Sequence, residues 1–106
     1  MWIFMSDSFL SIVDKGDHTG KTLLVRGRKK GDIERAFPSA KVIEGAGTDY
    51  RFRTRVEREE VALKMADAVR NIKYPNFKST VKEHDKHDAY MKVWSAMYSY
   101  QEGSDD

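Results

Sequence analysis

The stretch that decides the fold is YRFRTRV, residues 50–56. It alternates strictly: Tyr50 and Phe52 lead one set of positions, and arginines at 51, 53 and 55 fill the other. Because successive side chains of a strand point to opposite faces, this alternation predicts a strand with an apolar face and an arginine face. The apolar face needs a core, whereas an antiparallel sheet commonly leaves its other face open to water.

Four further extended runs precede this stretch. Trp2–Met5 and Phe9–Val13 flank Ser-Asp-Ser, residues typical of a tight turn, so we predict a β-hairpin. Thr22–Arg28 reads TLLVRGR and has the β-branched and apolar content of a strand. Lys41–Glu44 is a candidate for one more brief strand.

Two of the three predicted helices flank the alternating stretch. The first is short, Ile33–Phe37, with Asp32 as its expected N-cap. The second begins near Glu59 and Glu60, because negative side chains suit the first turn of a helix. Apolar side chains then recur at helical spacing and predict one buried stripe: Val61, Met65, Ala68, Val69 and Ile72.

The third predicted helix follows a break at Tyr74-Pro75, since the residue before proline is pushed out of helical geometry. It runs from about His84 to Tyr100, and the spacing of Thr80 and Glu83 before it matches a capping box. One side of this helix carries His87, Tyr90, Met91, Trp94, Met97 and Tyr98.

The order of these elements predicts an α+β fold, with a mostly antiparallel sheet and two long helices packed on one of its faces. The strands at 22–28 and 50–56, joined through the short helix, are candidates for one parallel pair. The nearest named architecture is ferredoxin-like. We expect one domain over residues 1–101 and a frayed acidic tail over 102–106.

The composition narrows the class of protein. The chain has 106 residues, of which 40% are hydrophobic and 34% charged, so it can fold around a single core. It contains no cysteine, which excludes disulfide scaffolds, thiolate metal sites and cysteine nucleophiles. The apolar start is interrupted by Asp7 and no basic residue precedes it, so we read it as a strand rather than a signal peptide. No run is long enough to span a membrane, and we expect a cytoplasmic protein.

The basic charge is concentrated in the middle of the chain. Residues 21–58 carry 11 basic and 5 acidic side chains, although the net charge of the whole chain is only +2. Clustered arginine on one sheet face indicates a surface for nucleic acid or another anion, and the simpler reading is a solvated face. Tyr50 and Phe52 are expected on the opposite face, unlike the base-stacking aromatics of RNA-recognition sheets. The candidate anion-binding residues are Arg26, Arg28, Arg51, Arg53, Arg55 and Lys78.

The aromatic side of the last helix has two readings. Its methionines and aromatic residues suit a core, but Trp, Tyr and Met are also enriched at protein interfaces. If part of this side is exposed, it forms a partner or homodimer interface with Tyr90, Trp94 and Tyr98 as the candidate residues.

Signals for catalysis are weak. His84 and His87 are three residues apart and could face one metal ion, but Lys82 and Lys86 beside them disfavour a cation. No nucleophile elbow, phosphate-binding lysine loop or zinc-protease motif is present. We therefore assign no catalytic, cofactor or metal residue.

Several segments together resemble a family of small bacterial proteins of about 100 residues to which no activity is assigned. The segments that carry the resemblance are Trp2–Phe4, Phe9–Val13, Leu24–Arg26, Gly31–Glu34, Thr48–Arg53, Tyr74–Lys78, His87–Tyr90 and Val93–Ser95. The resemblance implies a bacterial or phage origin and a stand-alone domain.

These features favour a small non-enzymatic binding module that binds nucleic acid or another anion through the arginine face. The alternative is a protein–protein interaction or homodimerisation domain built on the helix at 84–100. A small metal-independent ribonuclease, with His87 as general base, is the least favoured reading.

Overall fold

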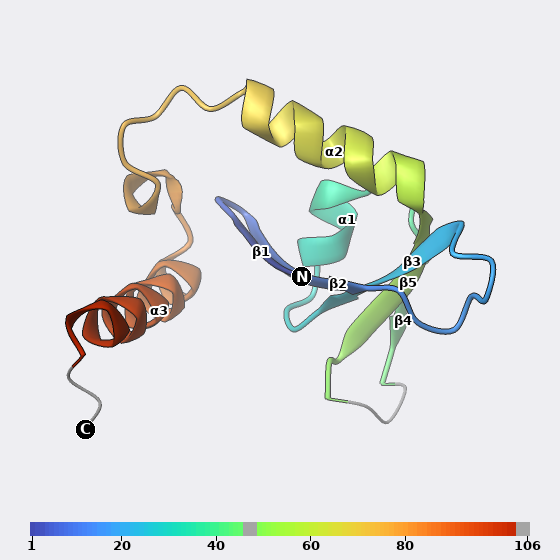
Figure 1. Ribbon diagram of the computed structural model, residues 1–106, viewed down its shortest axis with the longest axis horizontal. Coiled ribbons are helices and arrows are strands. Elements are labelled where there is room, and N and C mark those ends of the chain that lie inside the picture. Colours follow the sequence, from blue (N-terminus) through green and yellow to red (C-terminus); the bar gives the residue numbers. More distant parts are fainter. Residues whose placement is uncertain (46–48, 104–106) are drawn as a thin grey trace. The chain divides into compact units, whose positions relative to one another are not determined.

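A five-stranded antiparallel sheet forms the centre of the first of two compact units in the computed structural model (Figure 1). The structure describes residues 1–45 and 49–103. The first unit is Met1–Lys73 and the second begins at Tyr74. The strands are β1 (Trp2–Met5), β2 (Ser8–Val13), β3 (Thr22–Gly27), β4 (Ile43–Glu44) and β5 (Phe52–Glu57), in the spatial order β1-β2-β3-β5-β4.

The predicted α+β class, the hairpin and the alternation in β5 are confirmed. β1 and β2 pair antiparallel around residues 6 and 7. In β5, Phe52 and Val56 are buried, while Arg53 is half-buried and Arg55 is exposed. The regular alternation begins at Phe52, because residues 49–51 form a bend before the strand.

The predicted parallel pair is wrong, because β3 and β5 are antiparallel, with Arg26 opposite Arg53. The helix between them, α1 (Asp32–Ala36), has only five residues and is about 7.5 Å long. A six-residue strand such as β3 is about 20 Å long, so this helix does not return the chain along the strand. The ferredoxin-like arrangement stays a prediction.

Two helices cover one face of the sheet, which we call the covered face. α1 contacts β2, β3 and β5, and α2 (Arg58–Arg70) contacts β3 and β5. Figure 1 shows both helices on the same side of the strands. The core between these layers consists of Leu10, Ile12, Val25, Ile33, Ala36, Phe37, Phe52, Val56 and Val61.

The predicted stripe of α2 is correct only near its start. Val61 is buried and Met65 packs against the core, whereas Val69 and Ile72 are 67% and 52% exposed. α2 runs past the edge of the core, so the apolar side chains of its last turn and of the residues after it are exposed. The apolar residues of α2 therefore keep their helical spacing beyond the last residue that packs against the core.

The predicted N-cap of α1 is wrong in its details. Gly31 occupies the cap with a left-handed backbone, and Asp32 is the first residue of the helix. The Asp32 carboxylate is buried, where it accepts a 2.9 Å hydrogen bond from the Phe9 backbone N–H and pairs with Arg35. This carboxylate thus ties α1 to β2 instead of capping its own helix.

The second unit contains a single 3₁₀ turn, η1 (Lys78–Thr80), and a long helix, α3 (His84–Glu102). The expected capping box is not formed, because the Glu83 carboxylate itself accepts from the backbone N–H groups of Asp85 and Lys86. Thr80 instead donates to the Phe77 carbonyl. The single domain over 1–101 stays a prediction, as does the packing of α3 on the sheet. Residues 104–106 of the predicted tail lie outside the described part of the chain.

Candidate nucleic-acid interface

The sheet face opposite α1 and α2, which we call the open face, carries one continuous row of paired residues. The strand register places them opposite one another in the order Trp2 (β1), Ser11 (β2), Arg26 (β3), Arg53 (β5) and Ile43 (β4). All share one face, because paired residues of adjacent strands point to the same side of a sheet. The row therefore joins an exposed tryptophan at one edge to two arginines at the centre.

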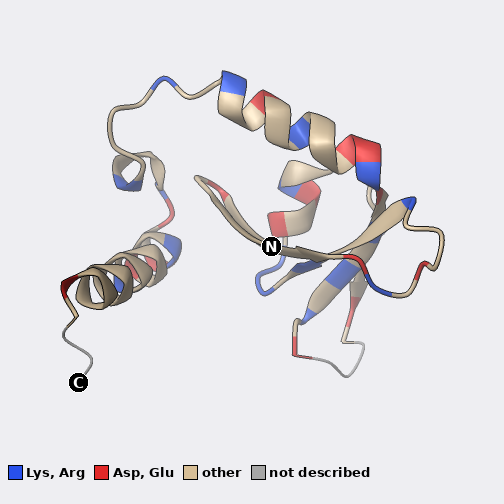
Figure 2. Ribbon diagram, viewed as in Figure 1, with Lys and Arg blue, Asp and Glu red and all other residues tan. Residues whose placement is uncertain are grey.

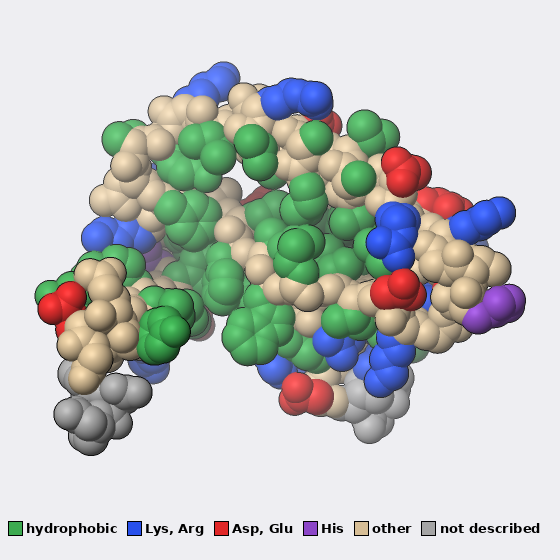
Figure 3. Space-filling view, viewed as in Figure 1, with side chains coloured by type: hydrophobic (Ala, Val, Ile, Leu, Met, Phe, Trp, Pro, Cys, Tyr) green, Lys and Arg blue, Asp and Glu red, His purple; other side chains and the backbone are tan. Residues whose placement is uncertain are grey.

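A second, parallel row lies two residues along the strands. Val13, Leu24 and Arg55 are paired in sequence across β2, β3 and β5. Figure 2 marks the basic residues along β3 and β5, and Figure 3 shows them bordering the side of the sheet away from α2. The open face thus combines an apolar strip on β2 and β3 with arginines on β3 and β5.

Arg26 and Arg53 face one another directly, which costs stability unless the charges are compensated. Arg26 donates from Nη2 to the Ser11 hydroxyl at 2.8 Å, and its guanidinium lies 4.6 Å from the centre of the Tyr50 ring. Both of these partners are neutral. Within the described residues, Arg26 has no carboxylate oxygen within 4.0 Å.

Tyr50 lies among the arginines, contrary to the sequence prediction. Its ring is also 4.0 Å from the Arg28 guanidinium, and the residue is only 5% exposed. The alternation failed here because Tyr50 lies in the bend before β5, where the two-residue period does not apply. The Tyr50 ring makes cation–π contacts with the guanidinium groups of Arg26 and Arg28. Phe52, in contrast, points into the core as predicted.

Two of the predicted arginines are paired with carboxylates. Arg28 bonds Asp49 at 3.3 Å, and this hydrogen bond is the main cause that raises the pKa of Arg28 above its ordinary value. Arg51 lies 3.9 Å from Glu44 at the exposed end of the sheet. Both pairs are exposed, so they contribute little to stability. Because these carboxylates partly neutralise Arg28 and Arg51, we place the centre of the candidate interface at Arg26, Arg53 and Arg55.

The loop between β2 and β3 is held in place beside Arg55. The Asp17 carboxylate accepts from the backbone N–H and hydroxyl of both Thr19 and Thr22, at 2.7–3.0 Å. These hydrogen bonds, led by those from the two hydroxyls, lower the pKa of Asp17 well below its ordinary range. Arg58 connects the two ends of the loop, because its guanidinium donates to the Asp14 carboxylate and to the Gly20 carbonyl.

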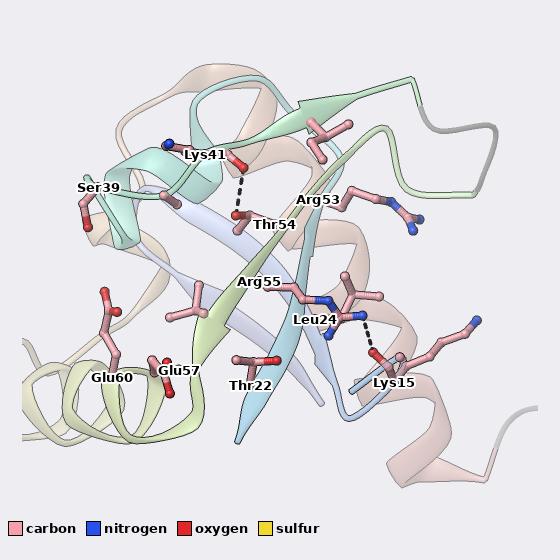
Figure 4. Close-up of a pocket in the computed structure, with 14 residues that line it drawn as sticks. Lys15, Thr22, Leu24, Ser39, Lys41, Arg53, Thr54, Arg55, Glu57 and Glu60 are labelled. Carbon is pink, nitrogen blue, oxygen red and sulfur yellow. Dashed lines mark hydrogen bonds between the residues drawn. The ribbon is translucent and has the colours of Figure 1, made fainter. Parts of the chain in front are cut away.

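Arg55 contacts this loop at its tip. Its Nη2 donates to the Lys15 carbonyl at 2.7 Å. The approach requires glycine at position 16, since a Cβ there would lie 2.1 Å from Nη2 and the backbone has φ +90°. The loop therefore fixes the direction of the Arg55 guanidinium above Leu24 (Figure 4).

A pocket of about 770 Å³ opens beside β5, next to the residues that lead into the two-residue strand β4 (Figure 4). Leu24, Ala40, Ile43 and Val56 supply its apolar lining. Its charged lining residues are Lys15, Lys41, Arg53, Arg55, Glu57 and Glu60. Arg53 and Ile43 belong both to this pocket and to the row that begins at Trp2.

The remaining predicted residues lie in the second unit. Lys78 places its ammonium 5.2 Å from the centre of the Trp94 ring, so its predicted grouping with the arginines stays a prediction. Tyr90 is only 9% exposed and stacks on Phe77, with ring centres 6.0 Å apart. Trp94 and Tyr98 stack on each other at 5.6 Å and are each 52% exposed.

In the histidine cluster, His84 contacts a carboxylate of its own helix. His84 Nε2 lies 3.4 Å from Asp88, and both side chains are exposed. Among residues 1–45 and 49–103, no three His, Cys, Asp or Glu side chains converge as metal ligands would. The same residues form no helix with the length and apolarity of a membrane span.

Sequence reasoning does not identify one residue of the open face, Trp2, or two cations of the neighbouring pocket, Lys15 and Lys41. It places Trp2 in a strand without assigning its face. The alternation of Trp2 and Phe4 along β1 is a usable signal, and the contact between the tilted rings of Phe4 and Phe9, with centres 4.6 Å apart, shows that these two residues share a face. Nothing local marked the two lysines, which the fold brings to the pocket from separate loops.

Comparison with known proteins gives no guide to this interface. No protein-family model, curated protein or solved structure matches the chain. The resemblance to the bacterial family therefore stays a prediction, and the functional argument depends on the geometry of the open face.

Proposed function

We propose that the protein binds single-stranded nucleic acid on the open face of the sheet. In this proposal, Arg26, Arg53 and Arg55 contact backbone phosphates. Trp2 provides a surface on which a base stacks. The combination of a basic track with an exposed aromatic ring is the usual arrangement of proteins that bind single strands.

The observation that carries the proposal is the row from Trp2 to Arg53. Two guanidinium groups are held opposite one another on a sheet, an arrangement whose repulsion costs stability unless the charges are compensated. The contacts of Arg26 with Ser11 and Tyr50 are neutral, so a bound phosphate would supply a negative charge beside Arg26. Trp2 is 70% exposed and lies two strands from Arg26, or about 10 Å, in the same row.

The shape of the open face favours a single strand over a duplex. The major groove of B-DNA is about 12 Å wide and admits a helix or a two-stranded ribbon. Five strands spaced about 4.8 Å apart form a surface too wide for that groove. Unpaired bases can instead lie on the sheet and stack on side chains.

Fluorescence titration tests the proposal. The chain has two tryptophans, so a Trp94→Phe variant leaves Trp2 as the reporter. We expect oligo(dT) and oligo(U) to quench this signal, with an affinity that falls as salt rises. Three phosphate contacts correspond to a log–log slope of about −2.

Matched variants separate the open face from the general charge of the protein. Arg53→Ala with Arg55→Ala removes two positive charges from the open face, whereas Lys64→Ala with Arg70→Ala removes two from α2. Only the first pair is expected to weaken binding. Equal losses in both pairs, or no quenching at low salt, would contradict the proposal. Intact RNA after incubation without divalent metal distinguishes this binding function from a ribonuclease.

Homodimerisation through α3 is a second candidate function. Trp94, Met97 and Tyr98 are 52%, 57% and 52% exposed, and they lie in residues 93–101 of the helix, which carry no charged side chain. Sedimentation at several protein concentrations tests it. A mass that doubles with concentration and returns to the monomer in Trp94→Ala/Tyr98→Ala would support it, and a constant monomer mass would exclude it.

A further inference from the structure

We infer that the pocket beside β5 recognises a terminal phosphate group of the bound strand. This inference rests on the proposed function and adds a preference that the open face alone does not provide. The ligand group is a phosphomonoester, at either the 5′ or the 3′ end, which carries one more ionisable oxygen than the diester linkages of the chain.

The position of the pocket supports an end-binding site. Arg53 and Ile43 form the last part of the row that starts at Trp2, and both also line the pocket. A strand that crosses the sheet along this row therefore reaches the pocket after passing Arg26. The pocket lies at an edge of the described sheet, beside the residues that lead into the edge strand β4.

The charges of the pocket match a phosphomonoester. Four basic side chains line it, from Lys15, Lys41, Arg53 and Arg55, against the two carboxylates of Glu57 and Glu60. The lining therefore has an excess of two positive charges. A phosphomonoester carries about −1.5 to −2 charges at pH 7, whereas a diester carries one. The terminal group thus neutralises the lining more completely than an internal phosphate does.

Arg55 is positioned for this role before any ligand binds. One of its five N–H donors is committed to the Lys15 carbonyl, which leaves the others for an acceptor. Gly16 makes this arrangement possible, and Asp17 holds the loop that presents the carbonyl. A guanidinium held in place loses less side-chain freedom when it binds an anion.

The apolar part of the pocket accommodates the last nucleotide. Leu24 is 7% exposed beneath Arg55, and Ile43 is 60% exposed at the rim. A base or sugar placed against Ile43 covers apolar surface while its phosphate faces the cations. The volume of about 770 Å³ lies within the range of small-molecule sites.

Binding of short oligo(dT) strands with different ends tests the inference. The strands carry a 5′-phosphate, a 3′-phosphate or hydroxyl groups at both ends, and the full-length protein is used. We expect one phosphorylated strand to bind at least five-fold more tightly than the hydroxyl-ended strand. Comparison of the two phosphorylated strands identifies which end the pocket accepts.

Variants of the pocket show whether its residues cause the preference for a terminal phosphate. Lys41→Ala removes an exposed cation and is expected to abolish the preference while leaving binding of the hydroxyl-ended strand within two-fold. Gly16→Ala displaces the Arg55 guanidinium, so it is expected to abolish the preference and also to weaken binding of the hydroxyl-ended strand. Lys64→Ala on α2 is the control and should retain the preference. Thermal melts establish that each variant is folded.

The outcomes separate the inference from the proposed function. Equal affinity for all three strands, or a preference that persists in Lys41→Ala, overturns the inference and leaves single-strand binding intact. Absence of binding to every strand overturns both.

Discussion

The two faces of the sheet are made by the same strands but have opposite properties. Along β3, Val25 is fully buried beneath the helices, while the next residue, Arg26, lies on the open face. The covered face lowers the free energy by removing apolar side chains from water. The open face instead holds two arginines against each other. Apolar burial explains the first arrangement but not two like charges side by side, so the open face is where we look for a ligand.

The largest effect is expected on the covered face. Leu10 on β2 is 0% exposed within the core, so Leu10→Ala should lower the free energy of unfolding by about 2–5 kcal/mol. Urea denaturation measures the change. Val13→Ala, from the half-buried open-face side of the same strand, serves as the comparison and should cost less. Equal losses at both positions would mean that the two faces are packed alike.

A smaller effect is expected for Trp2→Ala, this time on binding. Loss of one base-stacking surface costs about 1–3 kcal/mol, which corresponds to roughly a 5- to 150-fold weaker affinity for oligo(dT). Stability should change little, because Trp2 is 70% exposed on an edge strand. Fluorescence anisotropy with a labelled oligonucleotide measures the affinity. Wild-type affinity in this variant would remove Trp2 from the interface.

Arg53→Thr sharpens the comparison, because it removes the charge that faces Arg26. The substitution relieves the repulsion between the two arginines and introduces a residue favoured in strands. We expect the difference in the free energy of unfolding between low and high salt to shrink by about 0.2–1 kcal/mol, while oligonucleotide binding weakens. Urea denaturation at low and high salt checks this, since salt screens the repulsion. A loss of stability would show that Arg53 serves the fold rather than a ligand.

The smallest effect concerns the loop beside Arg55 and depends on pH. The pKa of Asp17 is lowered in the folded protein, so this carboxylate stabilises the fold above its unfolded pKa of about 3.9. The contribution is lost as the pH falls through the folded pKa. Asp17→Asn should therefore melt at a lower temperature than the wild type at pH 7, with the difference shrinking below about pH 4. A difference independent of pH would assign the effect to lost geometry instead of charge.

Part of the candidate site was predictable. Local alternation was enough to place Arg53 and Arg55 on the face opposite Phe52, because the two-residue period of a strand is a property of its own backbone. The same reasoning failed at Tyr50, since the chain bends there. It also could not distinguish the arginines that meet carboxylates from Arg26, because Asp49 and Glu44 reach their partners only once the strands are paired.

The helices show the same division. The period of α2 was visible in the sequence, yet only its first turns are buried, because burial depends on how far the sheet and α1 extend beneath it. The aromatic side of α3 was equally visible, but its periodicity does not distinguish core from interface. Trp94 and Tyr98 are exposed in the structure, and the sedimentation experiment tests whether they form an interface between two copies of the protein.

By itself, the sequence determined the α+β class, the leading hairpin, the strand with an arginine face and the approximate extent of the long helices, all of which follow from interactions between near neighbours in the chain. Only the tertiary structure decided that β3 and β5 run antiparallel, and that Trp2, Ser11, Arg26 and Arg53 form one row. It also decided that the loop at 14–17 fixes Arg55 beside a pocket. These features depend on strand register, which is set by how residues far apart in the sequence pack into one core, and no local pattern encodes that pairing.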